Sequence, residues 1–584
     1  GRTGMPAEDT AGRHPPRLDS GGGGWKTPPR VSIRRPLLLL LALVLAVPAL
    51  AAERVTLTVL QTSDLHANVL PWNYARGEAA DWGLARVATR VREIRKSSKH
   101  VLLLDGGDTI QGAPAGWLEA RRPKGEPHFM AAAMSALRYD AMAVGNHEFN
   151  FGLEVLRRAQ KDSSFPWLSA NTRHAAGGGP AFAEYVVKTL GGVRVGVLGL
   201  TTPNIPGWEP EANRPGLEWE DPVESAARLV PLLRQRERCD VVVVLFHSGL
   251  EIDPATGEAN GTDYENHVVR LARTVPGIDL ILTGHSHRRL PLTRVHGVPV
   301  TQPGRWGEVL ARVDLVVERA KGIARVVEAR GELLPSDGTV SVDPEIAAIA
   351  RPHHERALAY LDEPIATAAG PFPADRARLE DSALLDLINE TQLAATGAQL
   401  SMTSLLPYRH DGWKEGPVTV RDVYSIYPFE NQLVVVEIDG KRLRALLEHA
   451  ASFYESAEWK DGRLLLTPRA GMRPYNFDVV QGVSYRIDPT APAGRRVREV
   501  RYRGREVRDE DAFTLAVNSY RAQGAGGYAA LRGTRVVRAY NDEIRDLLVE
   551  RLRSAGTIHP VTDRNWVLAP ETSWAPPPAA ADPP

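Results

Sequence analysis

Six short apolar runs in the first 335 residues constrain the fold more than any other feature of the sequence. Each run is four to eight residues long, and segments of helical length separate one run from the next. Runs that are apolar throughout, rather than at alternate positions, are typical of strands buried on both faces. We therefore expect an α/β fold with a sheet covered on both faces, whose strands are Val55–Leu60, Val101–Leu104, Ala141–Val144, Val193–Leu200, Val241–Phe246 and Ile278–Leu282.

Carboxylate, imidazole or amide side chains follow five of these six runs at the point where each run ends. Open α/β sheets bind their ligands at the carboxyl ends of the strands. A single histidine in such a loop is usually structural, but five such loops at one edge indicate a shared site. The five segments are Ser63-Asp64-Leu65-His66, Asp105-Gly106-Gly107-Asp108, Gly145-Asn146-His147-Glu148, His247-Ser248-Gly249 and Gly284-His285-Ser286-His287.

The residue types in these loops favour divalent metal ions. Oxygen and nitrogen donors without a thiolate suit Mn, Zn, Fe or Mg rather than a soft metal. Two ions held close together need a carboxylate that bridges them, and Asp108 is the natural candidate. Such a pair lowers the pKa of a water and neutralises the charge on a phosphoryl group. His147, beside Asn146 but pointing elsewhere, fits the role of stabilising the departing oxygen.

Charge and cysteine content exclude several other classes of protein. Lys+Arg and Asp+Glu are each 71, so the net charge is zero and no overall basic field would attract polymeric nucleic acid. Cys239 is the only cysteine, which excludes an intrachain disulfide and a cysteine-rich zinc site. It opens an apolar run, and we interpret it as a small buried hydrophobe. With 43% hydrophobic residues the chain is not wholly disordered.

The two ends of the sequence differ from the rest in composition. We interpret residues 1–52 as a disordered extension followed by a signal peptide, because Arg34-Arg35 precedes the apolar run Pro36–Val47 and small residues follow it. Cleavage is expected after Ala51, with Ala52 as the near alternative. A retained membrane anchor is the alternative to a signal peptide. We expect an exported protein, periplasmic or extracellular, with no membrane span after cleavage. Residues 571–584, rich in proline and alanine, are expected to form a disordered tail.

The loop motifs together resemble those of the calcineurin-like metallophosphoesterases. With its second half, the chain resembles the secreted 5′-nucleotidase and 2′,3′-cyclic-nucleotide 2′-phosphodiesterase/3′-nucleotidase superfamily. The resemblance implies an N-terminal four-layer α/β/β/α sandwich at residues 53–335 and a C-terminal α+β substrate-binding domain at residues 363–570. A linker helix is expected at residues 336–362. The motifs are Asp64-x-His66, Gly107-Asp108, Gly145-Asn146-His147-Glu148, His247 and Gly284-His285-x-His287.

The same resemblance implies a ligand set for two divalent ions. One ion would take Asp64, His66, Asp108 and His287, and the other would take Asp108, Asn146, His247 and His285. His147 would be the catalytic histidine. The donor set does not distinguish among Mn, Zn, Fe, Co and Mg.

The resemblance also implies that the C-terminal domain holds the nucleoside base between two aromatic rings. The segment Tyr427–Asn431 points to Phe429, with Asn431 beside it, and the segment Asn518–Gly524 points to Tyr520. Arg409 is a further candidate for a phosphate or base contact, and a solvated surface arginine is an equal alternative for it. In this half we expect a helix at Ser382–Thr396, strands at Val418–Val420 and Leu433–Ile438, and a helix from Gly440.

Two departures from the 5′-nucleotidase pattern bear on the substrate. Asn150 stands where those enzymes usually carry the aspartate that pairs with the catalytic histidine. An amide orients the imidazole but cannot stabilise its charged form as a carboxylate does. Gly524–Gly527 lacks the aspartate that faces the ribose hydroxyls. Both changes, together with the segment Tyr475–Tyr485, look more like the cyclic-nucleotide phosphodiesterase/3′-nucleotidase branch.

We therefore predict an exported dimetal phosphohydrolase that acts as a 2′,3′-cyclic-nucleotide 2′-phosphodiesterase/3′-nucleotidase. Its partner is a small nucleotide rather than a polymeric nucleic acid, and we expect a monomer. A 5′-nucleotidase or UDP-sugar hydrolase is the first alternative, and a sulfur-ester hydrolase of related architecture is the second. A surface binding protein with the same fold and no catalysis is a third. It is disfavoured because binding alone requires neither a bridging carboxylate nor a spare imidazole.

Overall fold

The computed structural model describes residues 53–121, 126–254, 257, 265–320, 323–406, 411–429, 431–460 and 463–568. The predicted extension and signal peptide, the predicted tail and Arg409 lie outside these residues. Among the residues described, no helix is long and apolar enough to cross a membrane. Cys239 is 5% exposed, as expected for a small buried hydrophobe.

The first of two six-stranded sheets contains three of the predicted strands. Its order is β16-β15-β1-β4-β5-β6. The strands β1, β4, β5 and β6 are parallel, and β15 and β16 are antiparallel at one edge. The bounds are β1 (Glu53–Thr62), β4 (Val101–Asp105), β5 (Ala141–Ala143), β6 (Trp167–Leu168), β15 (Val309–Ala320) and β16 (Ile323–Pro335).

The second sheet contains the other three predicted strands, in the order β13-β14-β12-β11-β9-β8. Its four central strands are parallel, and β8 and β13 are antiparallel at its two edges. The bounds are β8 (Tyr185–Leu190), β9 (Val193–Thr201), β11 (Val241–His247), β12 (Leu280–Thr283), β13 (Arg289–Val295) and β14 (Val298–Pro303).

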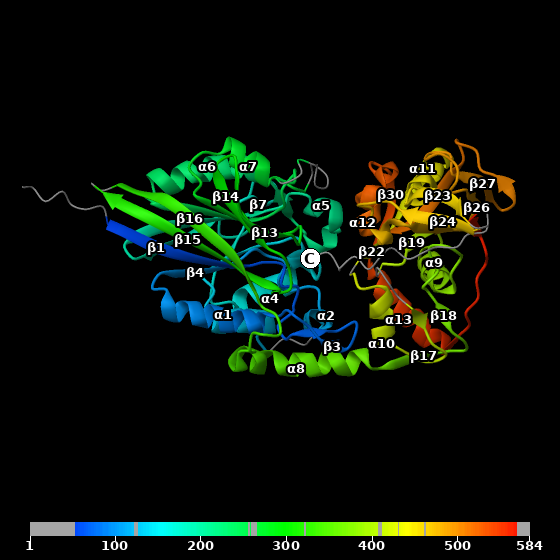
Figure 1. Ribbon diagram of the computed structural model, residues 1–584, viewed down its shortest axis with the longest axis horizontal. Coiled ribbons are helices and arrows are strands. Elements are labelled where there is room, and N and C mark those ends of the chain that lie inside the picture. The colour runs from blue at the N-terminus through cyan, green and yellow to red at the C-terminus, as the bar shows by residue number, and fades with distance from the viewer. Residues whose placement is uncertain are drawn as a thin grey trace, which may run out of the picture. The chain divides into compact units, whose positions relative to one another are not determined.

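Strand β11 shows why a predicted strand can carry apolar residues at consecutive positions. Val241, Val243 and Leu245 belong to a core that also contains residues of the first sheet, so they fill the space between the sheets. Val242 and Val244 pack instead with α6 (Pro222–Gln235) and α7 (Val268–Thr274), which cover the outer face (Figure 1). Each sheet is thus covered by helices on one face and by the other sheet on the other.

Helices α1 (Leu84–Ser97), α3 (Phe129–Ala136) and α4 (Gly152–Asp162) contribute to the core on the outer face of the first sheet, together with Leu103 and Met142. The expected four-layer α/β/β/α sandwich is therefore confirmed. The residue pattern alone predicted one sheet with two covered faces and the structure has two sheets, because a strand covered by helices and a strand covered by a second sheet need the same apolar residues.

Helix α8 (Pro344–Leu361) lies where the helical segment before the second domain was expected. It begins at Asp343, whose carboxylate accepts hydrogen bonds from the backbone N–H groups of Glu345 and Ile346, each at 3.1 Å. Four of its buried residues, Ile346, Ala350, Ala357 and Leu361, belong to the core that contains α1 and α3. His354 Nδ1 lies 3.0 Å from the hydroxyl of Tyr74. The boundaries of the linker and of the two domains stay predictions.

The C-terminal half is built on a five-stranded mixed sheet in the order β25-β19-β29-β22-β30. The expected helices are present, but Val420 begins a helix instead of ending a strand, because Thr419 and Asp422 form a capping box there. The bounds are β19 (Leu400–Ser404), β22 (Gln432–Asp439), β25 (Asp478–Gln481), β29 (Ala512–Asn518), β30 (Arg535–Glu543), α9 (Ala383–Thr396), α10 (Val420–Ile426), α11 (Gly440–Ala451), α12 (Ser519–Ala522) and α13 (Ile544–Ala555).

Short elements complete the described part of the chain. They are α2 (Pro114–Ala120), α5 (Ile205–Trp208), the pair β2 (Trp72–Asn73) and β3 (Glu78–Ala79), the pair β7 (Thr172–His174) and β10 (Leu217–Trp219), the pair β18 (Phe372–Pro373) and β20 (Gly412–Trp413), the pair β23 (Tyr454–Lys460) and β24 (Arg463–Pro468), the group β17 (Pro364–Ala368), β21 (Gly416–Thr419) and β31 (Thr557–Ile558), and the group β26 (Ser484–Ile487), β27 (Val497–Tyr502), β28 (Arg505–Glu506) and β32 (Trp566–Leu568).

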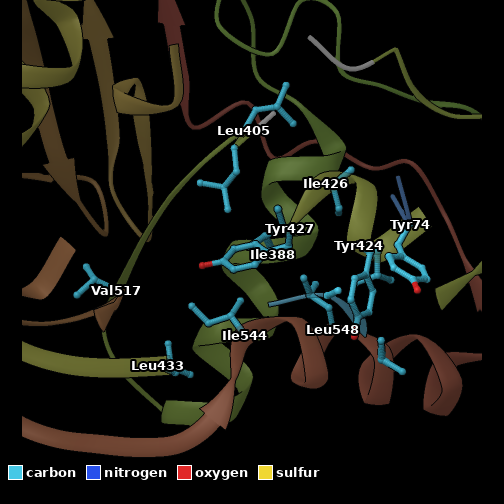
Figure 2. Close-up of a cluster of buried hydrophobic side chains, with 14 of the residues drawn as sticks. Tyr74, Ile388, Leu405, Tyr424, Ile426, Tyr427, Leu433, Val517, Ile544 and Leu548 are labelled. Atoms are coloured by element: carbon cyan, nitrogen blue, oxygen red, sulfur yellow. The ribbon is translucent and has the colours of Figure 1, made fainter. Parts of the chain in front are cut away.

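A buried cluster anchors the segment that follows α10. Figure 2 shows Tyr424, Ile426 and Tyr427 packed among Ile388 of α9 and Ile544 and Leu548 of α13. Tyr427 is fully buried, whereas Phe429, two residues later, is 47% exposed. The cluster therefore fixes the base of this loop and leaves the ring of Phe429 open to solvent.

Candidate active site

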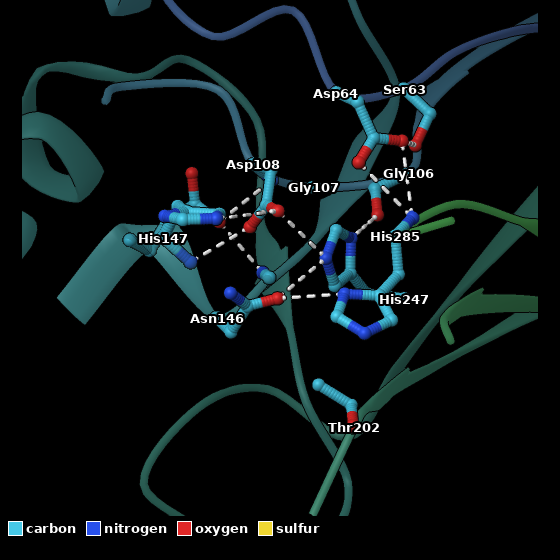
Figure 3. Close-up of polar contacts among 12 residues, drawn as sticks. Ser63, Asp64, Gly106, Gly107, Asp108, Asn146, His147, Thr202, His247 and His285 are labelled. Carbon is cyan, nitrogen blue, oxygen red and sulfur yellow. Dashed lines mark hydrogen bonds and ion pairs between the residues drawn. The ribbon is translucent and has the colours of Figure 1, made fainter. Parts of the chain in front are cut away.

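Loops from the carboxyl ends of both sheets converge on one site (Figure 3). The loops after β1, β4 and β5 come from the first sheet, and the loops after β11 and β12 come from the second. All seven residues predicted to bind metal lie here, in direct contact with one another. They are Asp64, His66, Asp108, Asn146, His247, His285 and His287.

Five of these seven residues have a left-handed backbone, which is uncommon for residues other than glycine. Such a conformation costs about 1–3 kcal/mol and persists only where the surroundings hold it, most often at functional sites. The φ angles are 52° for Asp64, 46° for His66, 57° for Asp108, 70° for His285 and 55° for His287.

The first donor cluster consists of Asp64, His66 and His287. Ligand atoms of all three lie within 4.8 Å of one another. His66 Nε2 is 3.0 Å from His287 Nε2, and His287 Nε2 is 3.4 Å from Asp64 Oδ1. Asp64 is fully buried and also accepts the backbone N–H of His285 at 3.1 Å, so this cluster abuts the second one.

The second donor cluster consists of Asp108, Asn146, His247 and His285. His247 Nε2 lies 3.0 Å from Asp108 Oδ2 and 3.1 Å from Asn146 Oδ1. His285 Nδ1 lies 2.9 Å from the same amide oxygen. Figure 3 shows Asp108 between His247 on one side and His147 on the other.

Two buried carboxylates hold the Asp108 loop in place. Glu148 accepts the backbone N–H groups of Asp108, Thr109 and Gly145 at 2.9, 2.6 and 2.7 Å. Asp105 accepts the N–H of Gly107 at 2.9 Å and hydroxyl groups of two threonines. A Cβ atom on Gly107, whose φ is +94°, would lie 2.8 Å from the nitrogen of Gly145, so only glycine lets these loops approach so closely.

The orientation of the imidazoles fits a cation in each cluster. His247 Nδ1 lies 2.7 Å from the carbonyl oxygen of Gly106, and His66 Nδ1 lies 3.0 Å from that of Gln111. A carbonyl only accepts, so both rings donate from Nδ1 and turn Nε2 toward the site. There each Nε2 meets carboxylate and amide oxygens or another imidazole nitrogen, an arrangement that a divalent cation satisfies.

The pKa values of these groups reflect a site rich in negative charge. Burial and the neighbouring His287 lower the pKa of His66 to about 3, so this imidazole is neutral. Burial would lower the pKa of His247 too, but the charges of Asp108, Asp64 and Glu148 outweigh it and raise the pKa to about 10. Burial likewise opposes ionisation of Asp108, yet His247 and His147 hold its pKa well below the usual range. Burial opposes ionisation of Asp64 as well, but His287 and His247 lower its pKa, so Asp64 and Asp108 stay ionised.

His147 lies at the edge of the second cluster, and its ring is not part of either donor set. Its backbone N–H donates to Asp108 Oδ1 at 2.8 Å, and its Nε2 is 4.0 Å from Asp108 Oδ2. Its other ring nitrogen, Nδ1, lies 2.6 Å from Asn150 Oδ1. The predicted pairing of these two residues is thus present in the structure, and Nε2 is left to face the site.

A cavity of about 500 Å³ lies beside the two donor clusters, and Tyr520 lines it. Its other wall includes Trp208, whose ring is 5.4 Å from the ring of His285, so the cavity adjoins the second donor cluster. Asn518 caps α12 by accepting the N–H of Arg521 at 2.7 Å, and Arg521 is buried in an ion pair with Asp478. These contacts anchor the segment on both sides of Tyr520, and Tyr520 itself is 42% exposed.

The other predicted substrate residues that the structure describes do not line the cavity of Tyr520. Phe429, though described and exposed, is not among the residues lining this cavity. Asn431 is half-buried, and its carbonyl accepts the N–H of Ile544 at 3.0 Å. Sequence reasoning missed Trp208, Glu148, Asp105 and Glu209, the last of which contacts Asn150. Glu148 stands inside a quoted motif, but no sequence pattern points to Trp208 or Glu209.

Comparisons with known proteins agree with this geometry. The calcineurin-like phosphoesterase family model matches residues 57–289, and the model of the 5′-nucleotidase C-terminal domain matches residues 364–533. The chain is 30% identical to the 2′,3′-cyclic-nucleotide 2′-phosphodiesterase/3′-nucleotidase of Salmonella typhimurium, over 91% of each chain. It is 28% identical to the trifunctional nucleotide phosphoesterase YfkN of Bacillus subtilis, over 92% of this chain but only 41% of the larger protein.

A solved structure gives the same result. The 5′-nucleotidase precursor from Thermus thermophilus superposes with a TM-score of 0.59 at 27% identity, over 88% of this chain and 99% of that one. The calcineurin-like fold uses two divalent metal ions, and the two donor clusters described above lie in that domain. The chain belongs to the 5′-nucleotidase family of metal-dependent phosphoesterases, in which a calcineurin-like phosphoesterase domain precedes a 5′-nucleotidase C-terminal domain.

Proposed function

We propose that this chain hydrolyses nucleotide phosphate esters, with 2′,3′-cyclic nucleotides and 3′-nucleotides as its preferred substrates. The observation that carries the proposal is a pair of adjoining donor clusters, which meet where Asp64 accepts the backbone N–H of His285, with His147 beside the second cluster and outside both. The relative from Salmonella typhimurium, which is named for this pair of activities, supports the choice of ester.

One divalent ion would be held by Asp64, His66, Asp108 and His287. The second would be held by Asp108, Asn146, His247 and His285, so Asp108 would belong to both sets. When bound, such a pair supplies Lewis acidity, which lowers the pKa of a water and neutralises phosphoryl oxygens. Glu148 and Asp105 fix the backbone of the bridging residue, so the donors are already arranged before an ion binds.

His147 would act on the oxygen that leaves phosphorus. Its Nε2 faces the site while Asn150 holds Nδ1, which fixes the ring in the orientation that acid catalysis requires. With a 2′,3′-cyclic nucleotide, a water that has lost a proton to solvent would bond to phosphorus through its oxygen, and the bond to O2′ would break. His147 gives a proton to O2′ and leaves a 3′-nucleotide, which the same site would then hydrolyse at O3′.

Recognition of the base would fall to Phe429 and Tyr520. Both rings are exposed, although their loops are anchored in the core. Each ring can therefore stack on a base without a rearrangement of its loop. Phe429 does not line the cavity of Tyr520, and a base held between both rings would require them to approach each other.

The wall of this cavity that belongs to the C-terminal half favours a phosphate on the ribose 2′ and 3′ positions. It includes Tyr520, Gly524–Gly527 and Arg532, and none of its described residues carries a carboxylate, whereas Glu265 lines the cavity from the N-terminal half, 3.7 Å from His285 Nε2. A phosphate at these positions therefore meets no like charge from the wall that holds Tyr520. Export to the periplasm or the extracellular space, and a monomeric state, are part of this proposal and rest on the sequence.

A hydrolysis panel on the purified chain tests the proposed function. The substrates are 2′,3′-cyclic AMP, 3′-AMP, 5′-AMP, a UDP-sugar, long RNA and bis(4-nitrophenyl) phosphate, each with and without a chelator. We expect chelator-sensitive hydrolysis, fastest for the first two. Preference for 5′-AMP or the UDP-sugar would contradict the choice of ester, cleavage of RNA would indicate a nuclease, and silence on every ester would indicate a binding protein.

A further inference from the structure

A row of three polar side chains leads from the site into the protein. His147 Nδ1 contacts Asn150 Oδ1 at 2.6 Å, and Asn150 Nδ2 donates a hydrogen bond to Glu209 Oε1. Glu209 directly follows α5 and is 6% exposed. The residue before it is Trp208, which packs against His285, so one short segment contacts both the donor cluster and the partner of His147.

The acceptors and donors in this row fix its direction. Asn213 Nδ2 donates to the second oxygen of Glu209 and to the carbonyl of Asn150, both at 3.0 Å. An ionised carboxylate can only accept, so it turns the amide nitrogen of Asn150 toward itself and the amide oxygen toward His147. His147 must then carry a hydrogen on Nδ1, which leaves Nε2 to hold or release the proton on the side of the site.

The row also brings a negative charge behind the imidazole. Asn150 is neutral, but a carboxylate one residue further on polarises its amide and strengthens the hydrogen bond between His147 Nδ1 and Asn150 Oδ1. Burial raises the pKa of Glu209 to about 7, while Asn213, His147, Asn150 and Arg214 act in the opposite direction. Arg214 also donates from Nε to the carbonyl of Glu209 at 3.0 Å, which ties the segment down.

We propose that Glu209 is a positioning residue that acts on His147 through Asn150 and supplies the charge that an aspartate at position 150 would otherwise provide. The proposal rests on the proposed role of His147 as the acid for the leaving oxygen. Glu209 itself does not touch the reacting atoms. Its effect should therefore depend on how much the leaving group needs a proton.

The test compares two kinds of ester in purified full-length variants. Glu209→Gln keeps the shape and removes the charge. It should lower kcat for 3′-AMP by about 10-fold, a part of the ~10²–10⁴-fold that acid catalysis contributes, and barely change kcat for 4-nitrophenyl phosphate, whose leaving group departs without protonation. Metal content should equal that of the wild type. Glu218→Gln, the same change at an exposed position nine residues away, is the matched control and should leave both rates unchanged.

Moving the carboxylate from position 209 to position 150 gives the most discriminating test. Asn150→Asp combined with Glu209→Gln puts the carboxylate directly on His147 Nδ1, and it should restore kcat for 3′-AMP to near the wild-type value. If Glu209→Gln does not fold, Asn150→Ala breaks the row instead and should reproduce the selective loss on 3′-AMP. Equal loss on both esters, no loss on either, or failure of the double variant to exceed Glu209→Gln would overturn the proposal.

The proposed function can fail separately. A wild-type chain that hydrolyses glycerol 2-phosphate and 4-nitrophenyl phosphate but no nucleotide would refute the nucleotide substrate. The same variants would then be compared on those two esters, since glycerol 2-phosphate also has a leaving oxygen that needs a proton.

Discussion

The loops around Asp108 and the loops around Tyr520 present their functional side chains in opposite ways. Asp64, Asp108 and His247 are no more than 1% exposed, have strained or closely packed backbones, and are held by further buried carboxylates. Phe429 and Tyr520 are 47% and 42% exposed, although buried residues next to each anchor its loop. Ion binding and proton transfer need fixed geometry, whereas stacking on a base tolerates variation in position.

The comparison implies that changes in the buried loops should abolish turnover and changes in the exposed loops should weaken binding.

Asp108→Asn is expected to have the largest effect, because it removes the only carboxylate predicted to serve both ions. Its hydrolysis of bis(4-nitrophenyl) phosphate should fall to that of the chelated wild type. Asp81→Asn, an exposed position, is the control. An Asp108→Asn variant with most of the wild-type activity would remove Asp108 from the reaction.

His147→Ala should have the next largest effect. We expect kcat for 3′-AMP to fall by about 10²–10⁴-fold, as for loss of an acid–base group, while both metal ions are retained. Kinetics and elemental analysis of the same sample provide the check. Loss of bound metal in parallel with activity would make His147 a ligand instead.

Tyr520→Ala and Phe429→Ala should have the smallest effect and a different character. Each removes stacking worth about 1–3 kcal/mol, so KM for 3′-AMP should rise by about 5–150-fold with kcat nearly unchanged. KM for glycerol 2-phosphate, which has no base, should not change. If both variants lowered kcat and left KM for 3′-AMP as it was, the exposed rings would have no part in base binding.

The same contrast explains how much of the molecule was predictable from its sequence. The central strands were predictable because β9 and β11 are buried on both faces along nearly their whole length and are therefore mostly apolar, and the donor loops follow such runs directly. Strand β16 escaped prediction because its residues are half-buried or exposed along its length. The division into two sheets was also beyond the residue pattern, and only the family resemblance implied it.

Some contacts of the site could not be predicted from the sequence for a different physical reason. Glu209 lies 59 residues from Asn150, and packing of the chain alone brings their side chains together. Trp208 reaches His285 in the same way. In contrast, His147 and Asn150 are one turn apart on η1 (His147–Phe149) and its cap, so their contact follows from local geometry. Partners within a turn are readable from sequence, whereas partners set by the tertiary fold are not.

The central claim is that two divalent ions held by the two donor clusters perform the chemistry. Its most direct test is the metal content of the purified chain, measured by elemental analysis and followed together with hydrolysis of bis(4-nitrophenyl) phosphate through chelation and metal restoration. The account predicts two ions per chain, loss of activity as they are removed and recovery as they return. A chain that hydrolyses the ester at full rate with no divalent ion bound would contradict it.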